Sequence, residues 1–149
     1  MAEKKRIDIV NRKAGFHYHI DVKFTAGMVL LGSEVKSIRN NSVNMGDAYC
    51  YFEVGELFVK NLHISEFKQA SFGAHEPLRN RKLLLTKKEL KKLVGKAKVK
   101  GTVIFPIRIF ETDRGLFKIE LGVGTGKKLH DKREDIKEKD VKRELERFK

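Results

Sequence analysis

The chain has 149 residues, of which 40% are apolar and 36% are charged, which is enough for one folded domain with an appendage. Its longest aliphatic runs, residues 28–31 and 83–85, are far too short to span a bilayer, and the charged N-terminus lacks the apolar core of a secretory signal. The net charge of +13, from 33 basic and 20 acidic residues, favours nucleic acid over a membrane as the partner.

Residues 16–24 are expected to form the first strand, after a loose arm over residues 1–10 and a short basic loop over 11–14. Apolar and polar residues alternate in this strand, which places the aromatic and aliphatic side chains on the core face of a sheet. His17 and His19 would then share the exposed face. A metal site there lacks a third ligand, so a solvated strand face is the interpretation that we favour.

A short helix is expected over residues 32–39. Val35 and Ile38 would face the core, while Lys36 and Arg39, three residues apart, would share an outer face. Such a pair of cations can straddle a phosphate, or it can be part of an ordinary exposed helix face.

The middle of the chain predicts a hairpin followed by a long loop. Residues 40–42 are typical of a turn, and the strands 48–54 and 57–64 would be joined by a hairpin turn at 55–56. Residues 65–80 lack periodicity, so we expect a loop there. Three basic residues form a cluster at the end of this loop: Arg79, Arg81 and Lys82.

A second helix follows a short apolar run, residues 83–85, which we expect to be buried. Thr86 and Glu89 match a capping box, in which the Thr hydroxyl accepts from the N3 amide and the Glu side chain reaches back to the N-cap amide. The helix would run to about Val94 and stop at Gly95.

Two further strands alternate apolar and polar residues around a turn at residues 112–115. Pro106 indicates that the first of them lies at an edge or contains a bulge. The apolar positions, which we expect to face the core, are Val103, Phe105, Ile107 and Ile109 in the first strand and Phe117, Ile119, Leu121 and Val123 in the second.

The stretch 122–133 joins the last strand to a highly charged tail. Its three glycines allow positive φ angles and close approaches, so we expect a turn that presents Lys127 and Lys128 to a polynucleotide. A P-loop is excluded, because Leu121 occupies the place of its first glycine and Lys128 that of its Ser or Thr. We expect no cofactor.

The predicted fold class is mainly β (α+β). About five antiparallel strands with two short helices favour a small closed or nearly closed barrel of the OB type over residues 1–125. Residues 126–149 would form a basic C-terminal tail, in which the pairs Asp135–Lys139 and Glu138–Lys142 favour a helix. Its apolar stripe is too thin to dock firmly, so we expect the tail to be partly disordered when free and helical when bound to a partner.

Six short segments, in a fixed order, cover almost the whole chain. They are NRKA at 11–14, AG at 26–27, GSEVKSIR at 32–39, the stretch from 75 to 85 that ends in RKLLL, GKK at 126–128 and DKR at 131–133. This pattern resembles the family of small protein B, the SsrA-binding protein of bacteria. The resemblance implies an OB-type barrel without enzymatic activity that partners transfer-messenger RNA in the rescue of stalled ribosomes. It also implies that the barrel binds the elbow of the tRNA-like domain, and that the tail enters the decoding centre among small-subunit ribosomal RNA.

The same resemblance implies two sets of RNA-binding residues. On the barrel, we expect one RNA-facing surface made of Asn11, Lys13, Lys36, Arg39, Arg79, Arg81 and Lys82. In the tail, the residues expected to meet the ribosome are Lys127, Lys128, His130, Asp131, Lys132, Arg133 and Lys137. The His130 ring can stack on an unpaired base, or it can simply be exposed.

Four positions depart from the family's pattern. Phe16 and Thr25 stand where many members have a histidine and a glutamate, so RNA contacts ascribed to those positions are not carried over. Thr125 replaces a residue that is often basic, and Val141 lies where some members carry a tryptophan.

The main hypothesis is a monomeric, non-catalytic RNA-binding translation factor. Its single Cys50 fits a reducing cytosol, which favours a cytoplasmic protein. One rival is an RNA nuclease that uses His17 and His19 with Asp21 as acid and base, although nothing in the sequence would tune their pKa values. Another is a general ribosomal or OB-type RNA binder. Cleavage of labelled RNA would identify the nuclease, and competition between transfer-messenger RNA and bulk tRNA would identify the general binder.

Overall fold

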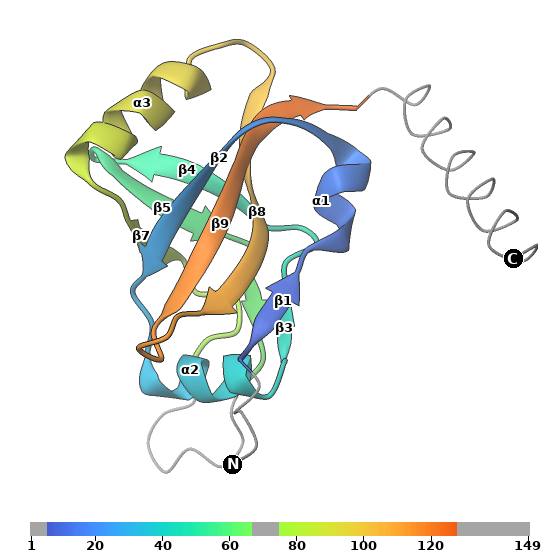
Figure 1. The fold of residues 1–149 in the computed structure, drawn as a ribbon, viewed down its shortest axis with the longest axis vertical. Coiled ribbons are helices and arrows are strands. Elements are labelled where there is room, and N and C mark those ends of the chain that lie inside the picture. The colour runs from blue at the N-terminus through green and yellow to red at the C-terminus, as the bar shows by residue number, and fades with distance from the viewer. Residues whose placement is uncertain (1–5, 67–74, 128–149) are drawn as a thin grey trace, which may run out of the picture.

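The structure is a computed structural model that describes residues 6–66 and 75–127, and these residues form nine strands and three helices (Figure 1). The strands are β1 (Asp8–Val10), β2 (Tyr18–Met28), β3 (Val43–Asn44), β4 (Tyr49–Glu53), β5 (Glu56–Lys60), β6 (His63–Ile64), β7 (Arg81–Leu84), β8 (Thr102–Glu111) and β9 (Phe117–Gly126). The helices are α1 (Arg12–His17), α2 (Gly32–Arg39) and α3 (Lys87–Ala97). The sequence predicted about five strands and two helices; α1 and the short strands β1, β3, β6 and β7 are additional.

Six of the strands form a closed antiparallel barrel. The pairing runs from β8 through β4, β5, β7, β2 and β9, and β9 pairs back with β8. The strand β1 adds to the edge of β8, while β3 and β6 form a separate two-stranded sheet. The prediction of a mainly β fold with an antiparallel barrel and short peripheral helices is therefore confirmed for this part of the chain.

The strand β9 supplies a continuous row of core side chains. Phe117, Ile119, Leu121 and Val123 are all buried, as their alternation predicted. They pack in one cluster with buried side chains from β4, β5, β7 and β8. Burial of one such aliphatic or aromatic side chain contributes about 1.5–3 kcal/mol, so this row is a main source of the stability of the barrel.

The strand β8 departs from the predicted alternation at Pro106. The pairing of β8 with β9 shifts register between Pro106 and Arg108, which is the bulge that the proline indicated. A bulge adds one residue to a strand, so the two halves of β8 point opposite sets of residues inward. Ile104 and Ile109 are buried in the core, whereas Val103 is 37% exposed, and the predicted core position of Val103 is wrong.

The N-terminal segment is more ordered than the sequence indicated. The strand β1 pairs with β8, and the Arg108 guanidinium donates to Asp8 (3.1 Å) and to Glu120 (3.0 Å), which ties β1, β8 and β9 together. Residues 12–17 form the helix α1 instead of a basic loop, so the first long strand begins at Tyr18. From there on, the predicted alternation is confirmed.

The β4–β5 hairpin has a two-residue turn at Val54 and Gly55, one residue earlier than predicted. Glu53 pairs with Glu56 across it, and both turn residues have positive φ (49° and 74°), as in the primed turns of tight hairpins. The return strand is also shorter than predicted, because Asn61 adopts a positive φ of 59° and separates β5 from β6.

The three glycines of the predicted turn lie inside β9 and have no positive φ, so that prediction is wrong. Two of them are needed for close packing. A Cβ atom on Gly124 would lie 1.6 Å from the carbonyl oxygen of His19, so β2 can cross β9 this closely only at a glycine. A Cβ atom on Gly122 would lie 2.7 Å from the Phe105 ring, which stacks on Tyr18 with a centroid separation of 4.2 Å.

The helix α3 begins where predicted and ends later. The Thr86 hydroxyl accepts from the backbone N–H of Glu89 (3.2 Å), but the Glu89 carboxylate accepts from that hydroxyl (3.0 Å) and not from the Thr86 amide. The helix continues through Gly95 to Ala97, so the predicted stop is wrong. Leu93 is fully buried beneath the helix and fixes it to the barrel.

Candidate nucleic-acid interface

A buried carboxylate holds the N-terminal end of α2. The Glu34 side chain is fully buried and accepts hydrogen bonds from the backbone N–H of Leu31 (2.8 Å), from Arg79 Nη2 (2.6 Å) and from Arg81 Nε. Burial alone would raise the pKa of Glu34, but the hydrogen bonds from Arg79 and Leu31 and the charge of Arg81 bring it below its ordinary value. Glu34 is therefore an ionised anchor inside the protein at neutral pH.

Arg81 belongs to the interior and not to the surface. Its side chain has no exposed area, and it also donates to the backbone carbonyls of Leu62 (2.7 Å) and Pro77 (3.1 Å). The alternation of β7 turns Arg81 and Leu83 inward, while Leu84, predicted to be buried, is 50% exposed. The prediction that Arg81 lies on an RNA-facing surface is therefore wrong.

His75 and two serines connect α2 to the neighbouring chain. His75 is buried, and its Nε2 donates to the carbonyl of Ile64 (2.8 Å) because a carbonyl oxygen only accepts. Its Nδ1 lies 2.8 Å from the Ser33 hydroxyl, and the Ser37 hydroxyl donates to the carbonyl of Ser65 (2.6 Å). These bonds give α2 a rigid base, so the outer face of the helix is fixed in direction.

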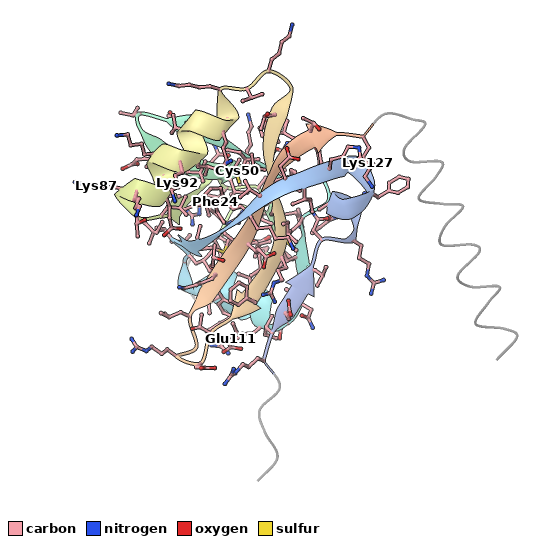
Figure 2. All side chains as sticks on the ribbon, turned by 45° about the horizontal axis from the view of Figure 1, so that its top comes forward. Phe24, Cys50, Lys87, Lys92, Glu111 and Lys127 are labelled. Carbon is pink, nitrogen blue, oxygen red and sulfur yellow. The ribbon has the colours of Figure 1, made fainter. Side chains whose placement is uncertain are left out.

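The outer face of α2 carries two exposed cations, Lys36 and Arg39, as predicted. Arg39 donates to Glu111 (3.0 Å) and lies over the Phe117 ring at 5.3 Å from its centroid; Figure 2 labels Glu111 at the lower end of the barrel. The Arg39 side chain is 42% exposed in this pair. Exposed ion pairs contribute only about 0–1 kcal/mol, so a phosphate can compete with Glu111 for Arg39.

Two other predicted cations already have protein partners. Arg79, whose side chain is 30% exposed, donates to Glu34 and to the carbonyl of Val29 (3.2 Å). Lys82 pairs with Glu56 at 2.8 Å on the exposed side of β7. Arg79 is thus mainly a support for α2, whereas Lys82 remains accessible.

Asn11, in the first segment predicted to bind RNA, has a structural role. The Asn11 side-chain amide donates to the carbonyls of Pro106 (2.8 Å) and Met45 (3.3 Å), so both of its hydrogens serve the fold and not RNA. Lys13 is exposed on α1, and its Nζ would lie 3.2 Å from a Cβ atom placed on Gly46. The Lys13 chain therefore lies over the turn that precedes β4.

The predicted barrel cations do not converge on one surface. Lys13 lies on α1, Lys36 and Arg39 on α2, and Lys82 on β7, and Figure 1 shows these three elements at different places around the barrel. The structure brings together only the pair on α2. The predicted cations therefore do not form a single compact patch on the barrel.

A hollow of about 440 Å³ lies where the chain leaves the barrel, and no sequence pattern predicted it. Its lining includes His17, Tyr18, Asp47, Tyr49 and Lys127, which come from three separate parts of the chain. Their order in the sequence carries no signal, because only the closure of the barrel brings them together. Aromatic rings beside a cation are the groups with which single-strand binders hold unpaired bases.

The exit of the tail is fixed by a backbone hydrogen bond. The Lys127 N–H donates to the carbonyl of His17 (2.8 Å), which continues the pairing of β9 with β2 one residue beyond the strand. Lys127 is the last described residue. The other tail residues predicted to meet the ribosome lie outside the described part of the chain: Lys128, His130, Asp131, Lys132, Arg133 and Lys137.

The residues of the nuclease alternative do not form the predicted arrangement. His17 ends α1 and His19 lies in β2, so they do not share a strand face. Within residues 6–66 and 75–127, no three His, Cys, Asp or Glu side chains are grouped to hold a metal ion, and no helix is long and apolar enough to cross a bilayer. Burial raises the pKa of the Cys50 thiol above its ordinary value, which keeps this potential nucleophile protonated.

Comparison with known proteins identifies the family. A family model described as SmpB protein matches residues 8–149. The chain belongs to the SmpB protein family. SmpB proteins are RNA-binding factors and not enzymes, so the resemblance noted in the sequence is confirmed and the nuclease alternative is excluded.

Several SmpB relatives match over nearly their whole length. The SsrA-binding protein of Cytophaga hutchinsonii is 48% identical over 144 residues, which cover 97% of this chain and 94% of that protein. The SsrA-binding protein of Anaplasma marginale is 51% identical over 138 residues, or 93% of each chain. A solved structure described as "tmRNA-SmpB: a journey to the center of the bacterial ribosome" is 40% identical, with a TM-score of 0.70 over 83% of this chain and 86% of that one.

Proposed function

We propose that this chain is a non-catalytic RNA-binding factor that binds the tRNA-like domain of transfer-messenger RNA and brings it to stalled ribosomes for trans-translation. The observation that carries the proposal is the match to the SmpB protein family over residues 8–149. Relatives that are 48–51% identical over more than nine-tenths of the chain are named SsrA-binding proteins, and SsrA is the transfer-messenger RNA. The protein would act with ribosomes in the cytoplasm.

In this proposal the barrel binds the tRNA-like domain. Lys36 and Arg39 lie on a helix whose base is locked by Glu34, so their charges are held in place before RNA arrives. A fixed cation loses less freedom on binding than a free one, which favours affinity. Arg79 and Arg81 serve as supports beneath this face, while Lys13 and Lys82 add exposed charge around the barrel.

The tail supplies the contact with the decoding centre. Lys128, Lys132 and Arg133 would meet phosphates of the small-subunit ribosomal RNA, and His130 would stack on an unpaired base. We place the division between a barrel at residues 1–125 and a tail at 126–149. The hydrogen bond from the Lys127 N–H to the His17 carbonyl, which is the last described pairing of the barrel, supports a division near this point.

Competition binding and truncation test this function together. Labelled tRNA-like domain should remain bound in the presence of excess bulk tRNA, whereas equal competition by tRNA would favour a general RNA binder. A chain cut after Lys128 should stay folded and bind the same RNA, because the described residues of the barrel form a buried core of their own. It should fail to support tagging of peptides on stalled ribosomes; tagging by the truncated chain would contradict the role of the tail.

A further inference from the structure

The helix α3 carries a row of lysines on its outer side. Its apolar face, with Leu90 and the fully buried Leu93, packs on the barrel. The opposite side is exposed to solvent, and Figure 2 labels Lys87 and Lys92 on it. We call this side the α3 lysine face; it consists of Lys87, Lys88, Lys91, Lys92 and Lys96.

None of these five lysines has an acidic partner within residues 6–66 and 75–127. The ion pairs of the barrel involve other cations, such as Arg39, Lys82 and Arg108. The single acidic residue of α3, Glu89, instead accepts from the Thr86 hydroxyl. The face is therefore an uncompensated block of positive charge.

This arrangement works against the stability of the helix itself. Like charges four residues apart repel each other on a helix surface, and Lys88 and Lys92 are such a pair, as are Lys92 and Lys96. Lys87 and Lys88 also occupy the first turn, where the helix dipole favours acidic residues. Local choices that oppose the fold are typical of functional surfaces.

Gly95 is a third unfavourable choice on the same face. It lies three residues after Lys92 and four after Lys91, in the middle of the lysines, and glycine is a poor helix former. No atom lies within 4 Å of a Cβ atom placed on Gly95, so packing does not require a glycine there. What the missing side chain provides is room for a ligand to approach the helix backbone between the cations.

We propose that the α3 lysine face is a second RNA-binding surface, which holds the phosphate backbone of an RNA stem without reading its sequence. This inference rests on the proposed function, since it assumes an RNA partner. Lysines four residues apart are spaced by about 6 Å along the helix axis, and contacts of their charges with phosphates fix the position of the RNA without reading its sequence. An anionic membrane does not fit, because the apolar face that would enter the lipid is buried against the barrel.

The α3 lysine face lies away from the point at which the described chain ends. In both views, α3 lies on one side of the barrel and the exit at Lys127 on the other (Figures 1 and 2). In this proposal the α3 lysine face contacts the tRNA-like domain and leaves the exit at Lys127 open for other contacts. Charge on α3 therefore adds to the affinity of the intact protein without competing with the tail.

The test is the salt dependence of RNA binding by the full-length chain. In the double variant Lys88→Gln/Lys92→Gln, the helix keeps good helix formers and loses two charges. Its slope of log affinity against log salt, measured with the isolated tRNA-like domain, should fall by about 0.7–0.9 for each lost phosphate contact. Its melting temperature should stay equal or rise, because repulsion is relieved. An unchanged slope would overturn the inference.

A substitution that alters no charge tests whether RNA approaches the helix backbone closely at Gly95. Gly95→Gln keeps every charge, improves the helix and fills the space between the lysines, so the melting temperature should rise while RNA affinity falls. A rise in both, or affinity equal to that of the unchanged chain, would show that nothing approaches the helix at Gly95.

The control variant removes the same number of charges at another place on the barrel. Lys60→Gln/Lys118→Gln removes two exposed lysines of β5 and β9 and should leave the slope almost unchanged. An equal fall in the control would mean that total charge and not the α3 lysine face matters. If the unchanged chain does not bind the tRNA-like domain, the proposed function fails; if it binds and the α3 variant binds equally, only this inference fails. If the α3 variant lost binding to vesicles of anionic lipid but kept its RNA affinity, the inference would also be overturned.

Discussion

The helices α2 and α3 lie at opposite ends of the barrel in Figure 1 and use charge in opposite ways. Beneath α2, Glu34 is enclosed by Arg79 and Arg81, and every charge there has a partner. On α3, five exposed lysines share one face and have no acidic partner among the described residues. Basic residues are thus structural beneath α2, where only the outer face keeps the exposed Lys36 and Arg39, whereas on α3 the whole row of lysines is available for binding.

The difference shows that net charge alone does not locate an RNA-binding surface. An arginine that is buried with a carboxylate contributes to the count of basic residues but not to the field outside the protein. The lysines of α3 repel one another in the free protein, and a bound phosphate relieves this repulsion. The useful quantity is therefore charge without a partner, which depends on the fold.

The largest effect is expected at Glu34. Replacing it by Gln keeps the shape but leaves Arg81 charged in the interior without a counter-ion, which should lower the free energy of unfolding by about 3–5 kcal/mol. Urea denaturation measures this. Glu89→Gln on α3 is the matched control and should change the value by less than about 1 kcal/mol. Equal small losses at both positions would contradict the comparison between the two helices.

Acidification should act on the same group. The ordinary pKa of a glutamate is 4.5, and that of Glu34 is lowered in the folded state by Arg79, Leu31 and Arg81 despite its burial. The ionised form therefore stabilises the fold fully above pH 4.5, and this contribution is lost as pH falls through the lowered pKa. The difference in unfolding free energy between the unchanged chain and Glu34→Gln should narrow in acid, and a constant difference would rule out this ionisation.

A smaller effect is expected at the start of α3. Thr86→Ala removes the hydroxyl that accepts from the Glu89 amide, which should lower the free energy of unfolding by about 1 kcal/mol. Thr86→Ser keeps the hydroxyl and serves as the control. Since the cap holds the first lysines in a helix, RNA affinity should fall with Ala and not with Ser. Identical behaviour of the two variants would show that the cap does not matter.

The smallest effect concerns the exposed pair of Lys82 and Glu56. A double-mutant cycle with Ala at both positions should give a coupling energy of about 0.2–1 kcal/mol, because solvent screens the 2.8 Å contact. High salt should reduce it further. A coupling as large as that beneath α2 would mean that burial does not distinguish the two kinds of pair.

Much of the barrel could be predicted, because its long strands alternate strictly. In residues 117–123 and in the strand that starts at Tyr18, apolar side chains occupy every second position and face the core. The rule failed in β8, where the bulge at Pro106 reverses the inward face and exposes Val103. At this bulge the alternation no longer predicts the inward face, whereas in β2 it continues across a shift of pairing between Ile20 and Val22.

The site was less predictable, because it depends on contacts between distant residues. Arg81 looked like part of a basic cluster, and its burial follows from Glu34, which lies 47 residues earlier in the chain. A local signal did exist, since Arg81 and Leu83 alternate with Lys82 and Leu84 in β7. Asn11 likewise gave no local indication that its amide would bind carbonyls of Met45 and Pro106.

The closure of the barrel through β9 has a consequence for synthesis of the chain. This last strand pairs with β2 and with β8, so neither of those edges is covered until residue 126 has been made. A nascent chain that lacks β9 exposes two unpaired strand edges, which are templates for aggregation. Its assembly also depends on contacts about a hundred residues apart, and such topologies fold slowly. The barrel is therefore completed only after residue 126 has been made, and shortened products that end before β9 should be recovered as aggregates.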